Sequence, residues 1–426
     1  MSNKADTALV KETLVNWSKQ LGEPEWLQEI RLKGLDKYFE LVANDVDASL
    51  ISIGEEEDLS EVHLNLLPEQ LQYIINSNTD NRSIIVYKNN TVLYKHLSAE
   101  LLRQGVNFTT LDNAVRKYPA LVRKYFLQSI EIAETPELAL HSALWNDGIF
   151  LFVPENVVID SPIQVVFIGT ESRLMPHTIV VAGENSSFTY VDLNLSISEE
   201  ISAQFNSVSE IYLERGANVE IFSNHSFNEN LSDYTHRQAT VAEDANLEWI
   251  ISEMNSGKTN SNNLFTLEGE HAKVEAKTIF VGAGDQRCNF TTKAMHDAPE
   301  TTSEIIFRGI MRNEASGVFN AITKMNKSVS KSETDQSVKV LMLSEKARAE
   351  ANPILLIDEY DVVAGHAASV GPVDPEDIYY LMSRGISREE AERLIIYGFL
   401  AMVVSRMPIE AMKDQLEAII EGKLLG

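Results

Sequence analysis

Cysteine is almost absent from this sequence: Cys288 is the only one in 426 residues. A disulfide within the chain is therefore excluded, which suits a reducing compartment. A metal cluster held in the usual way by several thiolates of one chain is excluded for the same reason. We predict that Cys288 is an inert, small hydrophobic residue, although the neighbouring Arg287 would favour a reactive thiolate if it lowered the thiol pKa.

Long apolar runs and an excess of basic residues are also missing. The apolar runs at 149–153 and 354–357 are far shorter than the roughly 20 residues that span a bilayer. The chain carries 36 Lys and Arg against 63 Asp and Glu, a formal net charge of −27. Because phosphate backbones attract basic surfaces, we expect no nucleic-acid partner. The first residues lack the apolar core of a signal peptide, so we expect a cytoplasmic protein without a membrane partner.

Recognisable catalytic motifs are absent as well. We find no Gly-x-Ser-x-Gly elbow and no zinc-type ligand spacing. The segment 252–259 resembles a phosphate-binding loop, but Ser252 replaces its first glycine, and turn-forming residues rather than a helix follow Thr259. We therefore expect a polar loop there and no ATPase activity. Four histidines share no short ligand spacing and are predicted to be ordinary core or surface residues: His225, His236, His271 and His296.

From about residue 137 the sequence contains a repeat of short apolar strands. A strand, an acidic or glycine-containing turn and a second strand recur in segments that begin at residues 179, 211, 239 and 265. This spacing of roughly 30 residues leaves no room for a helix and suits one solenoid turn per repeat. Alternating apolar residues, Val219 with Ile221 and Leu247 with Trp249, would point into such a solenoid. A β-sandwich of short strands is the alternative.

Helical patterns flank this core. Residues 1–136 mix helical and short strand patterns, which predicts a mostly helical α/β domain. After the core, Asp374 is a suitable N-cap, and a capping box follows at 387–390. We predict a β-helix core at 137–373 and a C-terminal helical domain at 374–426, which is too small to bury a large core and should dock on something.

The stretch 351–371, ANPILLIDEYDVVAGHAASVG, combines an apolar strand-like run, an acidic end and a single His366 among small residues. With Leu-Met-Ser-Arg-Gly-Ile at 381–386, it resembles the C-terminal signature of the SufB/SufD family, scaffold subunits of the SUF machinery that assembles iron–sulfur clusters. Ala364 stands where SufB-type sequences carry a cysteine two residues before the histidine. The chain therefore resembles the SufD side of the family. Weaker matches precede the signature in the family's order, at 143–154, 316–320 and 332–336.

The resemblance implies a right-handed parallel β-helix core and a scaffold role without catalysis. The expected partners are SufB, bound as a heterodimer through the last β-helix strands, and the SufC ATPase, bound through the C-terminal helices. The isolated subunit is expected to hold no cofactor, and a transient iron–sulfur cluster or iron would be shared with SufB. The candidate SufC-docking residues are Tyr379, Tyr380, Leu381, Arg384, Gly385 and Glu392.

His366 is the candidate cluster-assembly or interface residue. A neutral imidazole is a good iron ligand, and small neighbours allow a metal to approach. The residues alone leave open whether His366 binds metal or packs at an interface; the resemblance implies that it lies at the interface with SufB. Two other functions stay open: a β-helical carbohydrate-active or carbohydrate-binding protein with clustered carboxylates, and a homodimer formed through the same edge.

Overall fold

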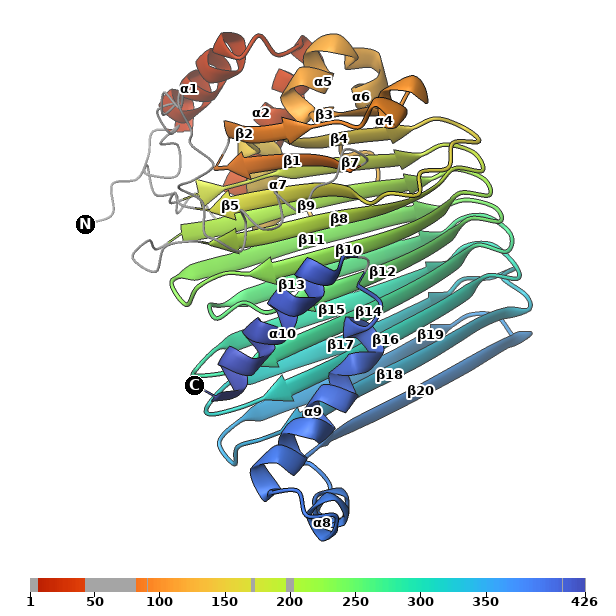
Figure 1. The fold of residues 1–426 in the computed structure, drawn as a ribbon. Helices are drawn as coiled ribbons and strands as arrows, with labels where there is room; N and C mark the ends of the chain where they lie inside the picture. The colour runs from red at the N-terminus through yellow and green to blue at the C-terminus, as the bar shows by residue number, and fades with distance from the viewer. Residues whose placement is uncertain are drawn as a thin grey trace.

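The structure, a computed structural model, describes residues 7–42, 82–89, 91–169, 173–196, 203–407 and 409–425. Two long β-sheets form the body of the molecule, and helices lie at its N-terminal end and over one sheet face (Figure 1). Consecutive strands of the core alternate between the two sheets, so that two strands make one turn of a solenoid with about seven turns. The predicted β-solenoid is confirmed, and the β-sandwich alternative is wrong.

The two sheets share their order along the solenoid axis. The first sheet runs β2 (Thr91–His96), β1 (Ser83–Lys88), β5 (Ile163–Gly169), β8 (Ser187–Ser196), β10 (Asn218–Ser226), β12 (Asn246–Glu253), β14 (Lys273–Gly282), β16 (Thr302–Met311), β18 (Ser332–Met342) and β20 (Val362–Gly371). The second sheet runs β3 (Asn107–Thr110), β4 (Gly148–Val153), β7 (His177–Ala182), β9 (Ala203–Leu213), β11 (Leu231–Val241), β13 (Thr259–Leu267), β15 (Arg287–His296), β17 (Ser316–Met325) and β19 (Arg348–Ile357), with β6 (Arg173–Leu174) beside β9.

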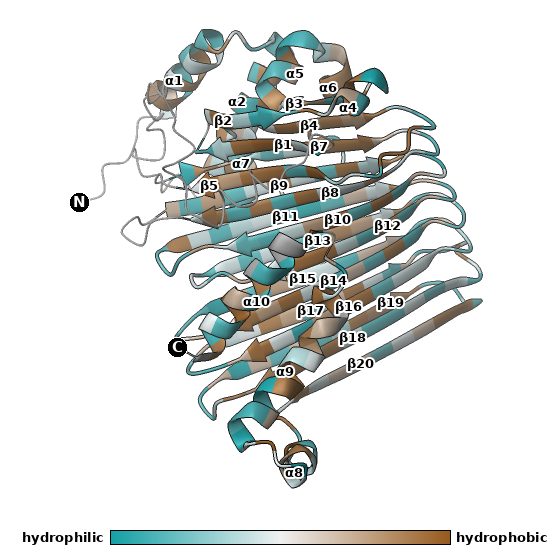
Figure 2. Cartoon of the chain, viewed as in Figure 1, coloured by the Kyte–Doolittle hydropathy of each residue, from teal (hydrophilic) through white to brown (hydrophobic). Residues whose placement is uncertain are grey.

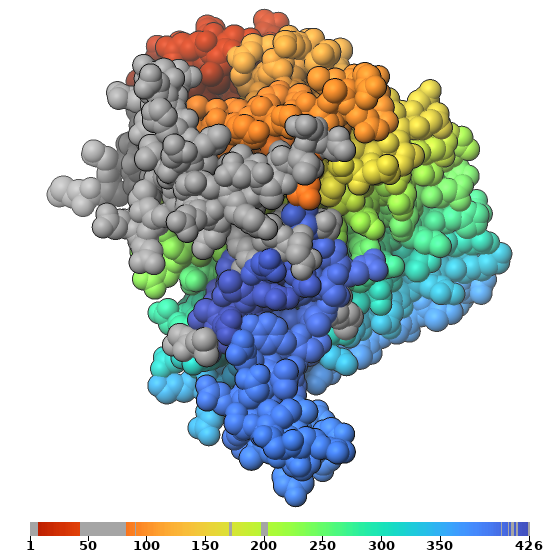
Figure 3. All heavy atoms as spheres, viewed as in Figure 1, coloured from red at the N-terminus to blue at the C-terminus, as the bar shows by residue number. Residues whose placement is uncertain are grey.

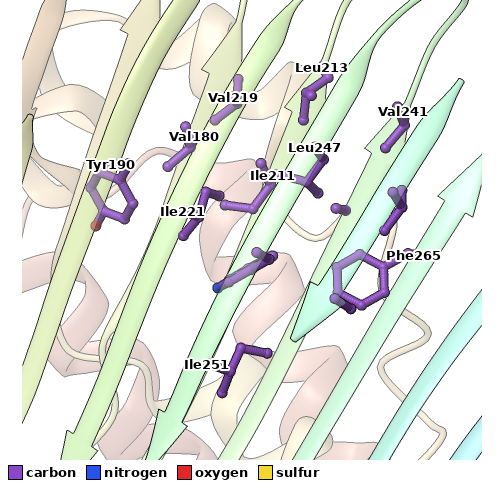
Figure 4. Close-up of a cluster of buried hydrophobic side chains, with 14 of the residues drawn as sticks. Val180, Tyr190, Ile211, Leu213, Val219, Ile221, Val241, Leu247, Ile251 and Phe265 are labelled. Carbon is purple, nitrogen blue, oxygen red and sulfur yellow. The ribbon is translucent and has the colours of Figure 1, made fainter. Parts of the chain in front are cut away.

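Alternating apolar residues build the solenoid interior as the sequence predicts. In parallel register, Val219 pairs with Leu247 and Ile221 with Trp249. All four side chains are buried in one continuous apolar core between the two sheets. Figure 4 labels three of them, Val219, Ile221 and Leu247. The chain becomes more hydrophilic at the ends of the strands, where polar turns join one sheet to the other (Figure 2). The core is therefore a column that adds one apolar layer with each turn.

The turns on one side of the solenoid form a ladder of their own. Asn185, Gly216, Asp244 and His271 have positive φ angles of 55°, 68°, 57° and 61°. Each backbone N–H at these positions donates to a carbonyl oxygen in the next turn, for example Gly216 to Glu243. Glycine, asparagine and aspartate tolerate this left-handed conformation best, which explains the Gly, Asn and Asp in the repeated turns.

The N-terminal region contributes strands as well as helices. Strand β1 pairs in parallel with β5, and β3 pairs antiparallel with β4, so strands from residues 1–136 continue both sheets. Its helices are α1 (Thr7–Gln20), α2 (Glu25–Leu41), α4 (Ala99–Arg103), α5 (Leu111–Lys117), α6 (Pro119–Tyr125) and α7 (Pro136–Leu144).

Arg31 is a buried cation that contacts several parts of this helical region. Its guanidinium lies 4.4 Å from the ring centre of Trp17 and 4.5 Å from that of Trp145, and it pairs with Glu23 at 2.6 Å. Arg31 also donates to the carbonyl oxygens of Ala143 and Trp145, at the C-terminal end of α7. A fully buried cation is tolerated because every one of these groups compensates its lost hydration.

The C-terminal helices are α8 (Pro375–Ser383), α9 (Arg388–Val404) and α10 (Glu410–Leu425). Asp374 caps α8 and Ser387 caps α9 through backbone N–H groups, as predicted. Leu400 and Ile420 of α9 and α10 pack on Ile250 and other apolar residues of the first sheet's outer face. The predicted docking surface of these helices is therefore the protein's own sheet, and only α8 projects beyond it (Figures 1 and 3).

Candidate functional site

The last turn of the solenoid leaves the core open at one end. Within the described chain, no strand pairs with the outer edge of β19 or β20. The register places Ile357 over Met325 and Val370 over Val340, which are buried residues of the solenoid interior. Ile357 and Val370 nevertheless have 39% and 41% of their surface exposed, because no further turn covers them. We call this surface, formed by the interior-facing residues of β19 and β20, the open end.

His366 lies in the middle of the open end. In parallel register it pairs with Gln336 of β18, and Ala364 pairs with Thr334. His366 is exposed, whereas Gln336 is fully buried beneath it. A Cβ atom at Gly365 would approach Asp335 Oδ1 to 2.7 Å, so a larger residue beside the histidine would require this exposed carboxylate to move. Part of the predicted site is thus a single imidazole on an otherwise apolar surface.

A chain of hydrogen bonds lies directly behind His366. Gln336 Nε2 donates to Thr323 Oγ1 at 2.7 Å, and Thr323 Oγ1 lies 3.0 Å from Thr334 Oγ1. Thr334 is 2.8 Å from Ser303 Oγ, which is 2.8 Å from His296 Nε2. Burial lowers the pKa of His296 to about 4, so its ring is neutral and one of its two nitrogens can accept a hydrogen bond.

The candidate docking residues lie on and after α8, in the part of the chain that projects from the solenoid (Figure 3). Tyr379 is 73% exposed, and Tyr380 is also exposed. Arg384 lies over the Tyr380 ring at 5.2 Å, and Gly385 has a positive φ of 89° in the turn between α8 and α9. Two further candidates are held within the chain: Leu381 packs beside Ile378, and Glu392 pairs with Arg388 at 3.0 Å.

A buried ionic cluster inside the solenoid was missed by sequence reasoning. Arg237 donates to Glu253 Oε1 at 3.1 Å and to His225 Nε2 at 2.8 Å, and His225 Nδ1 lies 2.7 Å from Asp233. His225, Asp233 and Glu253 have ligand atoms close enough for a metal ion, but the Arg237 guanidinium binds two of the three. Its positive charge therefore serves as the counter-ion of the cluster.

Three of the histidines singled out in the sequence do not form a shared site in the described part of the chain: His236, His271 and His296. His271 does not stack on His296, because Leu267 is the residue of β13 that pairs with His296. His271 instead contacts Glu300 at 3.0 Å and Asp244 at 3.2 Å on the exposed turns. His236 is buried, as an ordinary core histidine would be. A second missed cluster joins His141, His177 and Glu210 between α7, β7 and β9.

Cys288 is a buried residue of the apolar core. Burial raises the pKa of its thiol to about 12, and the positive charge of Lys423 only partly offsets this. Desolvation therefore outweighs the lowering of the thiol pKa by Arg287 that the sequence left open. The phosphate-loop-like segment is a loop between strands, as expected: it ends β12, forms the loop 254–258 and begins β13 at Thr259, without a helix.

Comparison with known proteins identifies the family. The SufBD core domain of the SUF iron–sulfur cluster assembly system matches residues 166–399, and the SufBD N-terminal region matches residues 75–165. The chain is 40% identical to the iron–sulfur cluster assembly protein SufD of Bacillus subtilis, over 97% of this chain and 98% of that protein. It is 26% identical to SufBD family proteins of Staphylococcus epidermidis and Staphylococcus haemolyticus, over 96% of this chain and 91% of each relative. The chain therefore belongs to the SufB/SufD family of iron–sulfur cluster assembly proteins.

Proposed function

We propose that this chain is a non-catalytic, cytoplasmic scaffold subunit of a SUF complex, in which its open end pairs with SufB. The observation that supports this most strongly is the uncovered interior of the last solenoid turn. Solenoids need capped ends to stay soluble, and exposed strand edges invite pairing with another chain. Membership of an iron–sulfur assembly family does not favour the carbohydrate-binding alternative.

Two features of the open end suit a strand-adding partner. The edges of β19 and β20 offer unpaired backbone groups, which another solenoid can extend by main-chain hydrogen bonds. Ile357 and Val370 offer apolar surface that such a partner would bury. When the subunit is alone, a second copy could use the same edges, so a homodimer is the form we propose in the absence of SufB.

In this proposal the nascent cluster is cargo that His366 shares with SufB. The open end offers one imidazole nitrogen, and Ala364 and Gly365 beside it have no ligand atoms. Cys288 is buried in the core and pairs with Thr259 and Gly317. One nitrogen ligand does not hold a cluster, so the thiolates must come from the partner.

The projecting helix α8 is the part that we assign to SufC. Exposed tyrosines make effective anchors, because they bury a large area at little cost in conformational entropy. Tyr379 and Tyr380 are the exposed pair, and Arg384 adds a charged group beside them. Because α9 and α10 pack on the first sheet, force on α8 would reach the solenoid through these helices.

Replacing His366 by alanine is expected to leave the complex intact while lowering its bound iron and sulfide several-fold. His366 is exposed, so its removal costs the fold little, but it takes away the only metal ligand at the centre of the open end. The test is co-expression with SufB and SufC, co-purification, and iron and sulfide counts. The matched control is His271→Ala, since His271 is also exposed but lies on a solenoid turn. If the complex with His366→Ala holds as much iron as the complex with His271→Ala, His366 is an interface residue only.

A further inference from the structure

Gln336 is held in one orientation by its neighbours. Its side chain is fully buried, and Nε2 donates to Thr323 Oγ1 at 2.7 Å and to the carbonyl oxygen of Ile354 at 3.2 Å. A carbonyl oxygen only accepts, so the nitrogen end of the amide must face Ile354. Within the part of the chain that the structure describes, the opposite atom, Gln336 Oε1, has no hydrogen-bond partner.

The strand register brings this unused acceptor next to His366. Gln336 and His366 are paired residues of the parallel strands β18 and β20. Paired residues of neighbouring strands project from the same face, with backbones about 4.8 Å apart. The other interior neighbour, Thr334, already contacts Thr323 and Ser303. Gln336 Oε1 is thus a buried acceptor, on the strand beside His366, that no described residue, His366 included, hydrogen-bonds in the structure.

We propose that Gln336 is a positioning residue for His366: its Oε1 accepts the ring N–H and thereby fixes the tautomer and the orientation of the imidazole. The nitrogen that donates to Gln336 faces the solenoid interior. The other nitrogen is then unprotonated and faces outward, as a metal ligand must. The value of this arrangement for cluster assembly rests on the proposed function, but the hydrogen bond itself does not.

The hydroxyl chain explains why glutamine can do this reliably. Thr323, Thr334 and Ser303 connect the nitrogen end of Gln336 to the neutral ring of His296. Each hydroxyl can donate to the next group, so the chain can end at an acceptor nitrogen of His296. Gln336 Nε2 then stays the donor to Thr323, and the amide keeps its orientation. An unpaired buried carbonyl costs free energy, and an N–H from His366 removes that cost.

The tautomer of His366 can be measured on the isolated subunit without iron or partner. The full chain is labelled with ¹⁵N-histidine, and ring proton–nitrogen correlation spectra are recorded at about pH 9, where an ordinary imidazole is neutral. The chain has nine histidines, so the His366 signals are assigned by their loss in His366→Gln. The expected result is a single tautomer, with one ring nitrogen protonated in at least nine-tenths of the molecules.

One variant tests the role of Gln336. Gln336→Leu is expected to give a mixture of both tautomers. Circular dichroism and thermal unfolding check that it folds. A tautomer mixture in the wild type, or a single tautomer that survives in Gln336→Leu, would overturn the proposal. Either result would leave the scaffold function untouched, because that function is tested separately by complex formation and iron content.

Discussion

Arg237→Met is expected to lower the free energy of unfolding by about 3–5 kcal/mol, the usual cost of breaking a buried ion pair from one side. Arg237 is 2% exposed, and its guanidinium contacts Glu253, His225, Ser261 and Asn263. Methionine fills a similar volume but leaves the carboxylates of Glu253 and Asp233 without their cation. Glu253 Oε2 already lacks a hydrogen-bond partner among the described residues. No second donor to that oxygen would therefore compensate for the lost guanidinium.

Urea unfolding of the isolated subunit measures this effect. The matched control is Arg215→Met, because Arg215 also pairs with a glutamate, Glu184, but lies on an exposed turn. We expect its unfolding midpoint to equal that of the wild type, since water solvates both groups after the change. A small loss in Arg237→Met, or equal losses in both variants, would mean that the interior cluster does not stabilise the solenoid.

Val370→Lys is expected to weaken pairing with SufB by about 100-fold or more. The change places an ammonium group on the apolar surface that the proposed partner would bury. Burying an unpaired charge costs several kcal/mol. Each 1.4 kcal/mol corresponds to about a tenfold change in affinity. The folded subunit itself should tolerate the change, because Val370 is 41% exposed before pairing.

Co-purification and a titration of labelled subunit with SufB test this expectation. Leu9→Lys is the matched control: Leu9 is an exposed leucine on α1, at the opposite end of the molecule (Figure 1). It should pair as the wild type does. If Val370→Lys pairs normally while Leu9→Lys does not, the partner binds the N-terminal end instead of the open end.

The solenoid itself could be predicted because its signal is local. The strand–turn–strand repeats predict the turns of the solenoid. The alternation of Val219 with Ile221 and of Leu247 with Trp249 predicts which side chains point inward. The helix caps at Asp374 and Ser387 were predictable for the same reason, since each involves residues two or three positions apart.

The buried clusters could not be predicted because they depend on the register between turns. Arg237, His225 and Glu253 meet only because β11 lies across the core from β10 and β12. Turn lengths vary, so a spacing such as that from His271 to His296 does not identify stacked residues; the stacked partner of His296 is Leu267. Contacts of this kind require the three-dimensional register, which no local pattern contains.

The position of the C-terminal helices was predictable only in part. The sequence indicated that residues 374–426 were too few to fold around a core of their own, but it did not identify the surface that would cover them. That surface is formed by outward-facing residues such as Phe222, Ile250 and Ile279, each on a different strand of the first sheet. Apolar residues that lie side by side on different strands are far apart in the sequence, so no local pattern identifies the surface that they form.

Hydrogen–deuterium exchange of the subunit, alone and with SufB, tests the central claim most directly. The account predicts that the outward-facing backbone amides of β19 and β20 exchange rapidly in the lone subunit, at a concentration where it is monomeric, and become protected in the complex, since the partner's strands then supply their hydrogen bonds. Amides of β1 and β2, at the other end of the first sheet, should not change. Protection elsewhere, with β19 and β20 still exchanging rapidly in the complex, would contradict pairing through the open end.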